Sequence, residues 1–362
     1  MAFNMQFKIL QIKRMQLLLL LQRGNENMVK KNSRNLRFHV AVVGTMSSGK
    51  STLLNAMLGV KILPSRNEAC TSKVFRVSDM DSLETFRARG IHRHSHCSSW
   101  VPVDGDLLEQ WNCGDYREIH VEGNFPHIDN TRRQLGIAFF DTPGPNNSCD
   151  EGHAEMTRRI LDAEGYALIV CVLNATQFGV DDERDLLESI LDAANARGRN
   201  ARVLFAVNKM DCLDPERGES PVDLMKQVRT YLRDIGYYQP LVVPVMSLLS
   251  LRIRTTLSQA FNGQGIALSS RRQRQLVNDL TFHRHVHEHS RRALLHTPRY
   301  QQYLARAQAQ KREHDRRRSI VLGDQSFRVS HLVENDILTG VPVLEEALEV
   351  EMLKFGRRMR RK

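Results

Sequence analysis

The pattern of apolar and polar positions divides the chain into two stretches. Between Arg37 and about Ser250, short apolar runs typical of buried strands alternate with segments whose apolar positions recur at helical spacing. This alternation predicts an α/β fold whose mostly parallel sheet is flanked by helices. After Ser250, long arginine-rich segments with few strand signals predict an α-helical extension. We therefore expect a basic amphipathic leader over residues 1–36, an α/β domain over 37–250 and a basic α-helical region over 251–362.

The first junction between a strand and a helix carries a phosphate-binding pattern. The run LRFHVAVV predicts a buried strand, and STLLNAMLG predicts a helix that ends at Gly59. Between them, residues 44–51 read GTMSSGKS and fit G-x-x-x-x-G-K-[ST]. Such a loop turns backbone N–H groups and the positive end of a helix dipole toward one point. We expect Lys50 to neutralise β- and γ-phosphate oxygens and the Ser51 hydroxyl to bind Mg²⁺.

A second motif indicates which nucleotide this loop binds. The predicted strand RVLFAV runs directly into residues 208–211, which read NKMD. Guanine presents two adjacent N–H donors that one carboxylate can accept together, so Asp211 is the candidate for reading the base, and GTP is favoured over ATP. We expect Asn208 to tie this base loop to the phosphate loop and the Lys209 stem to cover the base. Ser247, which ends the run LVVPVMS, is a candidate for a backbone contact to the guanine oxygen.

Two further segments are expected to contact the γ-phosphate and its metal. The predicted strand LGIAFFD ends at Asp141, which would hold Mg²⁺ through water, and the Gly144 N–H would contact the γ-phosphate. The polar loop ILPSRNEACTSK offers Thr71 as a second hydroxyl on Mg²⁺, with Ser72 as its competitor. The order of phosphate loop, threonine, DTPG and NKxD along the chain predicts an enzyme that hydrolyses GTP.

The segments GTMSSGKSTLLNAMLG, LPSRNEACT, DTPGPNNS, VLNATQFGVDD and NKMDCLDPERGES closely resemble the bacterial dynamin-like GTPases. The resemblance covers about residues 37–250 and, on fewer features, extends to a replication-clamp-associated member of that family. It implies GTP hydrolysis, a GTPase domain that often pairs with a second copy and, in many members, a helical stalk with a membrane-binding tip. The phosphate loop that it implies comprises Gly44, Thr45, Met46, Ser47, Ser48, Gly49, Lys50, Ser51 and Thr52.

The residues that orient the attacking water differ from those of better-known relatives. Pro145 stands where small GTPases of the Ras type place a glutamine, and Met46 stands where eukaryotic dynamins usually carry one. We therefore expect the Thr71 carbonyl and the Gly144 N–H to hold the water.

The charge that develops on the leaving oxygens requires a cation besides Lys50 and Mg²⁺. Ser47 matches a serine that, as the resemblance implies, helps to seat K⁺ or Na⁺. Arg66, from the loop that contains Thr71, is the alternative source of positive charge.

The composition restricts the compartment and the partners. The 362 residues are 41% hydrophobic and carry a formal net charge of +11, which favours an anionic partner: phosphate, a membrane surface or nucleic acid. The six cysteines have no framework spacing, which favours a cytoplasmic protein, with peripheral membrane attachment as an addition. The leucine run 17–21 is too short to span a bilayer, which needs about 20 residues. No signal-peptide cleavage site follows it.

Three functions remain open at this point. The first is an enzyme that couples GTP hydrolysis to self-association as a homodimer, at a membrane in one version. The second is a GTP-gated switch that recruits a chromosome-replication or cell-division partner such as the DNA sliding clamp, because residues 16–20, QLLLL, resemble a clamp-binding peptide. The third is a ribosome-assembly GTPase, which the positive charge alone favours.

Whichever function holds, the amphipathic segment GVPVLEEALEVEMLKF is expected to form a helix that packs back on the GTPase domain.

Overall fold

The computed structural model describes residues 37–64, 73–92, 96–103, 106–128, 135–142, 167–196, 202–261, 269–282, 298–310 and 318–359. The chain divides into two units, Met1–Arg37 and Phe38–Lys362. The leader expected over residues 1–36 lies outside the described residues. In the described part of the chain, no helix combines the length and the apolar character needed to cross a membrane.

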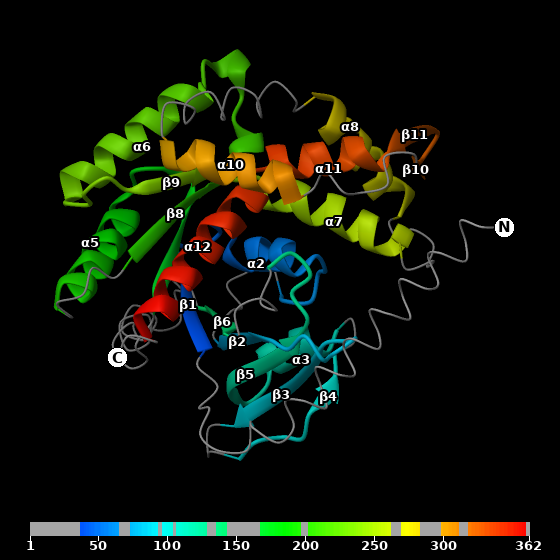
Figure 1. Cartoon of the computed structure of the whole chain (residues 1–362), viewed down its shortest axis with the longest axis horizontal. Coiled ribbons are helices and arrows are strands. Elements are labelled where there is room, and N and C mark those ends of the chain that lie inside the picture. The colour runs from blue at the N-terminus through cyan, green and yellow to red at the C-terminus, as the bar shows by residue number, and fades with distance from the viewer. Residues whose placement is uncertain are drawn as a thin grey trace. The chain divides into compact units, whose positions relative to one another are not determined.

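A nine-stranded sheet forms the framework of the described residues (Figure 1), in the order β4-β3-β5-β2-β6-β1-β7-β8-β9. Its strands are β1 (Arg37–Val43), β2 (Val74–Asp79), β3 (Arg87–His92), β4 (Val101–Pro102), β5 (Tyr116–Gly123), β6 (Gly136–Asp141), β7 (Leu168–Asn174), β8 (Arg202–Asn208) and β9 (Leu241–Pro244). Strands β1, β7, β8 and β9 pair in parallel, as do β2 and β5. Strand β2 is antiparallel to β6, and β3 is antiparallel to β4 and β5. The predicted α/β fold with a mostly parallel sheet is confirmed.

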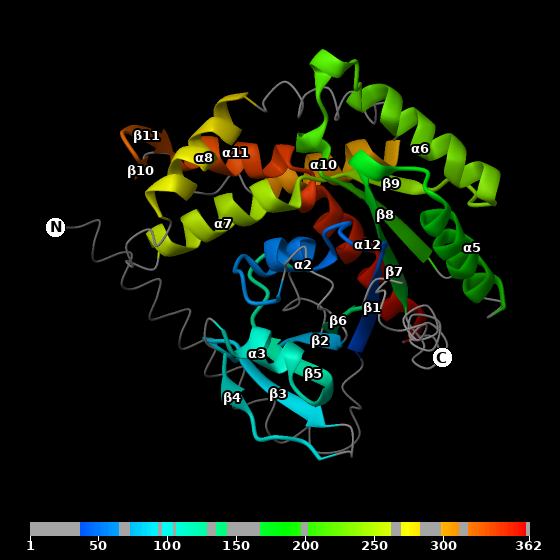
Figure 2. The same ribbon diagram turned by 180° about the vertical axis from the view of Figure 1, so that it is seen from behind.

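Helices cover the sheet, as the buried strands require. All seven residues of β7 and the last five of β8 are buried, as is usual for parallel strands covered on both faces. The helices are α2 (Lys50–Leu58), α3 (Leu107–Cys113), α5 (Asp181–Ala196), α6 (Pro221–Ile235), α7 (Ser247–Phe261), α8 (Ser270–Phe282), α10 (Pro298–Gln310), α11 (Val329–Leu338) and α12 (Val341–Met359). Helices α5 and α6 pack together beside β8 and β9, as Figures 1 and 2 show from opposite sides.

The C-terminal region differs from the expected purely helical extension. It contains a hairpin of β10 (Ser319–Leu322) and β11 (Gln325–Arg328), which pair antiparallel. Two residues connect these strands, and the first of them, Gly323, has φ 60°, which suits a tight turn. Burial alternates along β10, with Ile320 and Leu322 buried and Val321 62% exposed. The sequence SIVLGDQSFR does not show this alternation, because three apolar residues follow one another.

The C-terminal helices also pack against the α/β part of the chain. Helix α12 contacts α2, and the Phe355 ring meets the Phe38 ring of β1 edge to face, with 5.4 Å between centroids. The expected packing of the segment GVPVLEEALEVEMLKF onto this domain is thus observed. The domain boundary expected near Ser250 falls inside α7, which contacts both α2 and α11 (Figure 2).

A buried arginine on α7 joins the C-terminal helices to α2. The Arg254 side chain is fully buried, and its guanidinium donates to the Ala56 carbonyl of α2 at 3.0 Å, to Asp336 of α11 at 3.0 Å and to Glu345 of α12 at 2.9 Å. Burial lowers the pKa of Arg254, but the charges of Asp336 and Glu345 outweigh this effect and raise it. The guanidinium therefore stays charged and connects four helices at one point.

Candidate functional site

The phosphate loop lies between β1 and α2, at the carboxyl edge of the parallel strands, and two glycines shape it. A Cβ atom on Gly44 would lie 2.4 Å from the Val172 carbonyl oxygen, and one on Gly49 would lie 2.3 Å from the side-chain nitrogen of Asn208. Gly49 also has φ 93° and precedes α2 without a side-chain cap. The first N–H groups of α2 therefore have no capping side chain, an arrangement that suits a bound anion.

Lys50 places its ammonium group inside this loop. Its Nζ donates to the carbonyl oxygens of Gly44 at 2.8 Å and Thr45 at 3.0 Å. Burial lowers the pKa of Lys50, while the charge of Asp141 opposes this effect. The cation thus lies beside the backbone that the sequence predicts to surround the phosphates.

Ser51 and Asp141 come together from distant parts of the sequence. The Ser51 hydroxyl donates to Asp141 Oδ2 at 2.6 Å, and Asp141 Oδ1 is buried with no hydrogen-bond partner among the described residues. Burial raises the pKa of Asp141 to about 6, although the hydrogen bond from Ser51 and the charge of Lys50 lower it. A hydroxyl, a carboxylate and an unsatisfied buried oxygen fit a hard cation such as Mg²⁺, which prefers oxygen ligands.

Asn208 connects the phosphate loop with the base loop. Its side-chain nitrogen donates to the Ser48 carbonyl at 2.9 Å, and its Oδ1 accepts from the Ser247 N–H at 3.1 Å. The sequence leads us to expect the first of these contacts. Ser247 is the first residue of α7, whereas β9 ends at Pro244, so Ser247 begins a helix instead of ending a strand. One amide side chain thus holds three loops at the same edge of the sheet.

The base loop turns sharply after β8. Lys209 has φ 63°, in the left-handed region, and a 3₁₀ turn over Met210–Cys212 follows. Asp211 lies in this turn and is half-buried. Because of this turn, the backbone at Asp211 no longer follows the direction of β8. The change of direction occurs directly after Asn208, which contacts the phosphate loop.

Other predicted residues lie at the loop surface or outside the described residues. Met46 is 45% exposed, and Ser47 is exposed with a left-handed backbone, φ 58°. Thr52 follows in the first turn of α2 and is half-buried. Several predicted residues lie outside the described residues: Thr71, Ser72, Gly144, Pro145, Arg66 and the segment 16–20.

Two buried polar residues that sequence reasoning missed also support the site. Thr142, directly after Asp141, donates its hydroxyl to the Val42 carbonyl at 2.9 Å and so fixes the end of β6 to β1. Asn55 on α2 accepts from the backbone N–H groups of Ile62 and Leu63 at 3.0 and 2.8 Å. Thr142 could have been found as the second residue of the DTPG motif, whereas nothing in the local pattern distinguishes Asn55.

Comparisons with known proteins agree with these motifs. Residues 40–210 match the family model described as the dynamin family. A bacterial dynamin-like protein of Nostoc punctiforme is 28% identical over 198 residues, which are 49% of this chain and 26% of that protein. The chain thus spans about a quarter of the length of this curated relative.

Solved structures with similar folds include an oligomerised bacterial dynamin pair, whose description offers a mechanism for the long-range sensing and tethering of membranes. It has a TM-score of 0.47 and 16% identity and covers 84% of this chain and 48% of that one. Era of Aquifex aeolicus bound to GDP and AlF₄⁻ has a TM-score of 0.34 and 19% identity, over 62% of this chain and 56% of that one. Residues 40–210 are thus similar to the dynamin family, and the phosphate-loop, DTPG and NKMD motifs lie within this matched stretch.

Proposed function

We propose that this chain is a dynamin-like GTPase that binds GTP with Mg²⁺ and hydrolyses it to GDP and phosphate. The observation that carries the proposal is the bridge through Asn208, from Ser48 of the phosphate loop to Ser247. A phosphate loop alone serves ATP and GTP alike. Its direct connection to the NKMD turn supports a site in which the Asp211 carboxylate would accept the paired donors of guanine.

Each group has a distinct role in binding. The backbone of residues 44–52 and the Lys50 ammonium would hold the phosphates, and Asp211 and the Ser247 backbone would hold the base. Ser51, Asp141 and Thr71 would hold Mg²⁺, which when bound would neutralise negative charge on the phosphate oxygens.

Hydrolysis requires a positioned water and sufficient positive charge. In our proposal the Thr71 carbonyl and the Gly144 N–H orient the water for attack on the γ-phosphorus, and the bond to the β-phosphate oxygen breaks. Lys50 offsets the charge that develops on the leaving oxygens. Ser47 would help to bind K⁺ or Na⁺, and Arg66 is the alternative source of positive charge.

Asp211→Asn tests the base assignment. Loss of the carboxylate removes two charge-assisted hydrogen bonds, so we expect GDP affinity to fall by about 10- to 100-fold. Xanthosine diphosphate should then bind the variant better than GDP does, because xanthine presents an oxygen where guanine presents an amine. Competition for a fluorescent GDP analogue measures both affinities. Asp234→Asn, an exposed aspartate on α6, is the matched control. An unchanged preference for GDP in the Asp211 variant would remove the base-loop assignment.

We further propose that copies of this chain associate through the GTPase domain when GTP is bound and act in the cytoplasm or on its membrane surfaces. The dynamin-family match and the net charge of +11 support this extension. Turnover per molecule should then rise with protein concentration, as steady-state phosphate release at increasing protein concentration would measure. A rate per molecule that stays constant across the range would contradict association.

The two other functions have less support. The clamp-recruiting switch depends on residues 16–20, which lie outside the described residues, and on the resemblance to a replication-clamp-associated member of the family. No contact among the described residues favours it. The ribosome-assembly function was based on net charge alone, and the described residues add nothing to it.

A further inference from the structure

A cavity of about 440 Å³ lies at the edge of the sheet opposite to the nucleotide loops. Its lining residues are Arg229, Arg233, Gln239, Pro240, Leu241, Pro298 and Arg299. Leu241 is the first residue of β9, so this is the edge where the parallel strands begin. The phosphate loop and the base loop follow the other ends of these strands.

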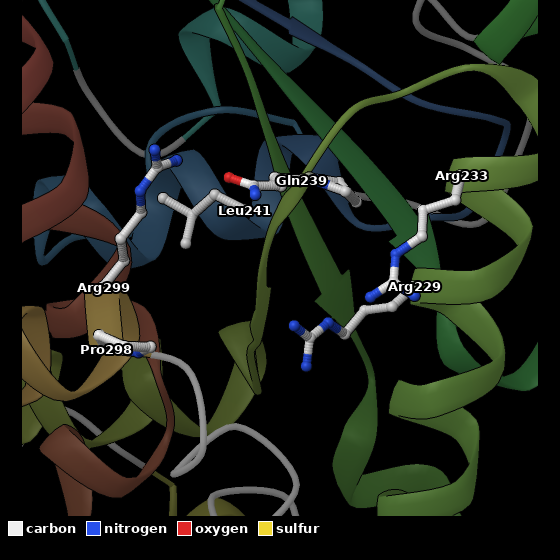
Figure 3. A pocket seen from close by; sticks show the side chains of 7 residues that line it. Arg229, Arg233, Gln239, Leu241, Pro298 and Arg299 are labelled. Carbon is white, nitrogen blue, oxygen red and sulfur yellow. The ribbon is translucent and has the colours of Figure 1, made fainter.

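Arginines reach this cavity from two different helices. Arg229 and Arg233 are one turn apart on α6, and Arg299 is the second residue of α10. Figure 3 shows the α6 pair on one side and Arg299 on the other, with Leu241 between them. The cavity is therefore mostly apolar, with the half-buried Arg229 and the exposed Arg233 and Arg299 around it.

None of these arginines has a carboxylate partner among the described residues. Arginines that do pair with a carboxylate are Arg87, Arg184, Arg202, Arg217, Arg252 and Arg254. Burial lowers the pKa of Arg229, and the charge of Arg233 beside it lowers that pKa further. Among the described residues, like charges thus surround a hollow without pairing to a carboxylate, and a bound anion would relieve their repulsion.

The chemistry of the cavity favours phosphate as that anion. A guanidinium donates two parallel N–H groups to phosphate oxygens, and several guanidinium groups can share one dianion. A carboxylate carries only one negative charge and therefore neutralises less of the positive charge of the arginines. Phosphate monoesters, with close to two charges at neutral pH, match the site better.

A second cavity of about 440 Å³ adjoins the first and would accommodate an organic group. The two share Gln239, Pro240, Leu241 and Arg299. The second is lined in addition by Tyr238, which is 89% exposed, and by the buried Tyr303. It also contains Glu351, whose carboxylate pairs with Arg202 and Lys354. Together the volumes fall in the range of small-molecule sites, about 300–1,000 Å³.

We propose that this cavity binds the phosphate group of a phosphate monoester through Arg229, Arg233 and Arg299, with the organic part of the ligand against Leu241 and Tyr238. The ligand is either a soluble phosphorylated molecule or the headgroup of a phosphomonoester lipid. The site is separate from the nucleotide loops, so the inference does not depend on GTP binding.

Calorimetric titration of the full chain with phenyl phosphate at low salt tests the soluble form. We expect saturable binding that weakens about tenfold or more in the double variant Arg229→Gln/Arg299→Gln, because two charge-assisted contacts are lost. Arg184→Gln/Arg271→Gln, which replaces two exposed arginines on α5 and α8, is the matched control for charge, and Lys50→Ala is the control for the phosphate loop. Both should retain binding, and thermal unfolding would verify that every variant is folded.

Flotation with vesicles tests the lipid form. Phosphatidylcholine vesicles that contain phosphatidic acid are compared with vesicles in which phosphatidylserine gives the same net charge. If the chain floats with phosphatidic acid vesicles only, and the double variant does not, the ligand is a lipid headgroup. If the chain binds phenyl phosphate through these arginines but does not float with either kind of vesicle, the ligand is a soluble molecule. The proposal is overturned if neither probe binds, if binding is unchanged in the double variant, or if only Lys50→Ala abolishes it.

Discussion

Replacing Lys50 with alanine is expected to lower the affinity for GTP by about 100-fold and to reduce turnover to background, because charge-assisted hydrogen bonds to phosphate contribute about 1.5–3 kcal/mol each. The structure already directs this ammonium into the loop, where it donates to the carbonyl oxygens of Gly44 and Thr45. Alanine cannot replace a positive charge at that position. Titration of a fluorescent GTP analogue and steady-state phosphate release measure the two effects.

Lys61→Ala is the matched control for this experiment. Lys61 lies just after α2 and is exposed, so its removal changes the net charge by the same amount without touching the loop. Its nucleotide affinity should equal that of the unmodified chain. If Lys50→Ala kept normal turnover while folded, the chemistry would have to occur elsewhere in the molecule.

The second large effect is expected on stability. Arg254→Met removes the cation from a buried cluster and takes its positive charge away from the carboxylates of Asp336 and Glu345. Breaking a buried ion pair in this way costs about 3–5 kcal/mol in the free energy of unfolding. Urea denaturation followed by circular dichroism measures the change. Since Arg254 also binds the Ala56 carbonyl of α2, the C-terminal helices and the phosphate-loop helix should lose structure in the same transition.

Two comparisons separate charge from packing in that result. Arg184→Met removes an exposed arginine that pairs with Glu188 on the same helix and should leave the free energy of unfolding almost unchanged. The triple variant Arg254→Met/Asp336→Asn/Glu345→Gln removes the buried charges together and should recover part of the lost stability. If Arg254→Met were as stable as the control, the cluster would not hold the helices together.

The nucleotide site could be predicted from the sequence because each of its motifs is short and local. The spacing of Gly44, Gly49 and Lys50 encodes the loop directly, and a strand that ends at Asp141 or Asn208 delivers its next residues to the same edge of the sheet. Parallel strands have this property whatever their order. The hydrogen bond between Ser51 and Asp141 follows from it, although ninety positions separate them in the sequence.

The structure of the C-terminal region was harder to predict from the sequence, for physical reasons. Abundant arginines predict solvated helices, but Arg254 is fully buried because Asp336 and Glu345, far along the chain, compensate its charge. The arginine-lined cavity depends in the same way on how α6 and α10 approach each other. No local pattern encodes such an approach, because it is determined by packing between distant elements.

The central claim is that one crevice, formed by the phosphate loop and the base loop, binds a guanine nucleotide. A crystal structure of the chain grown with a non-hydrolysable GTP analogue and magnesium tests it most directly. We expect the triphosphate against the backbone of residues 44–52, with Lys50 on its oxygens and guanine beside Asp211. A structure in which the analogue bound elsewhere, or did not bind at saturating concentration, would contradict the account.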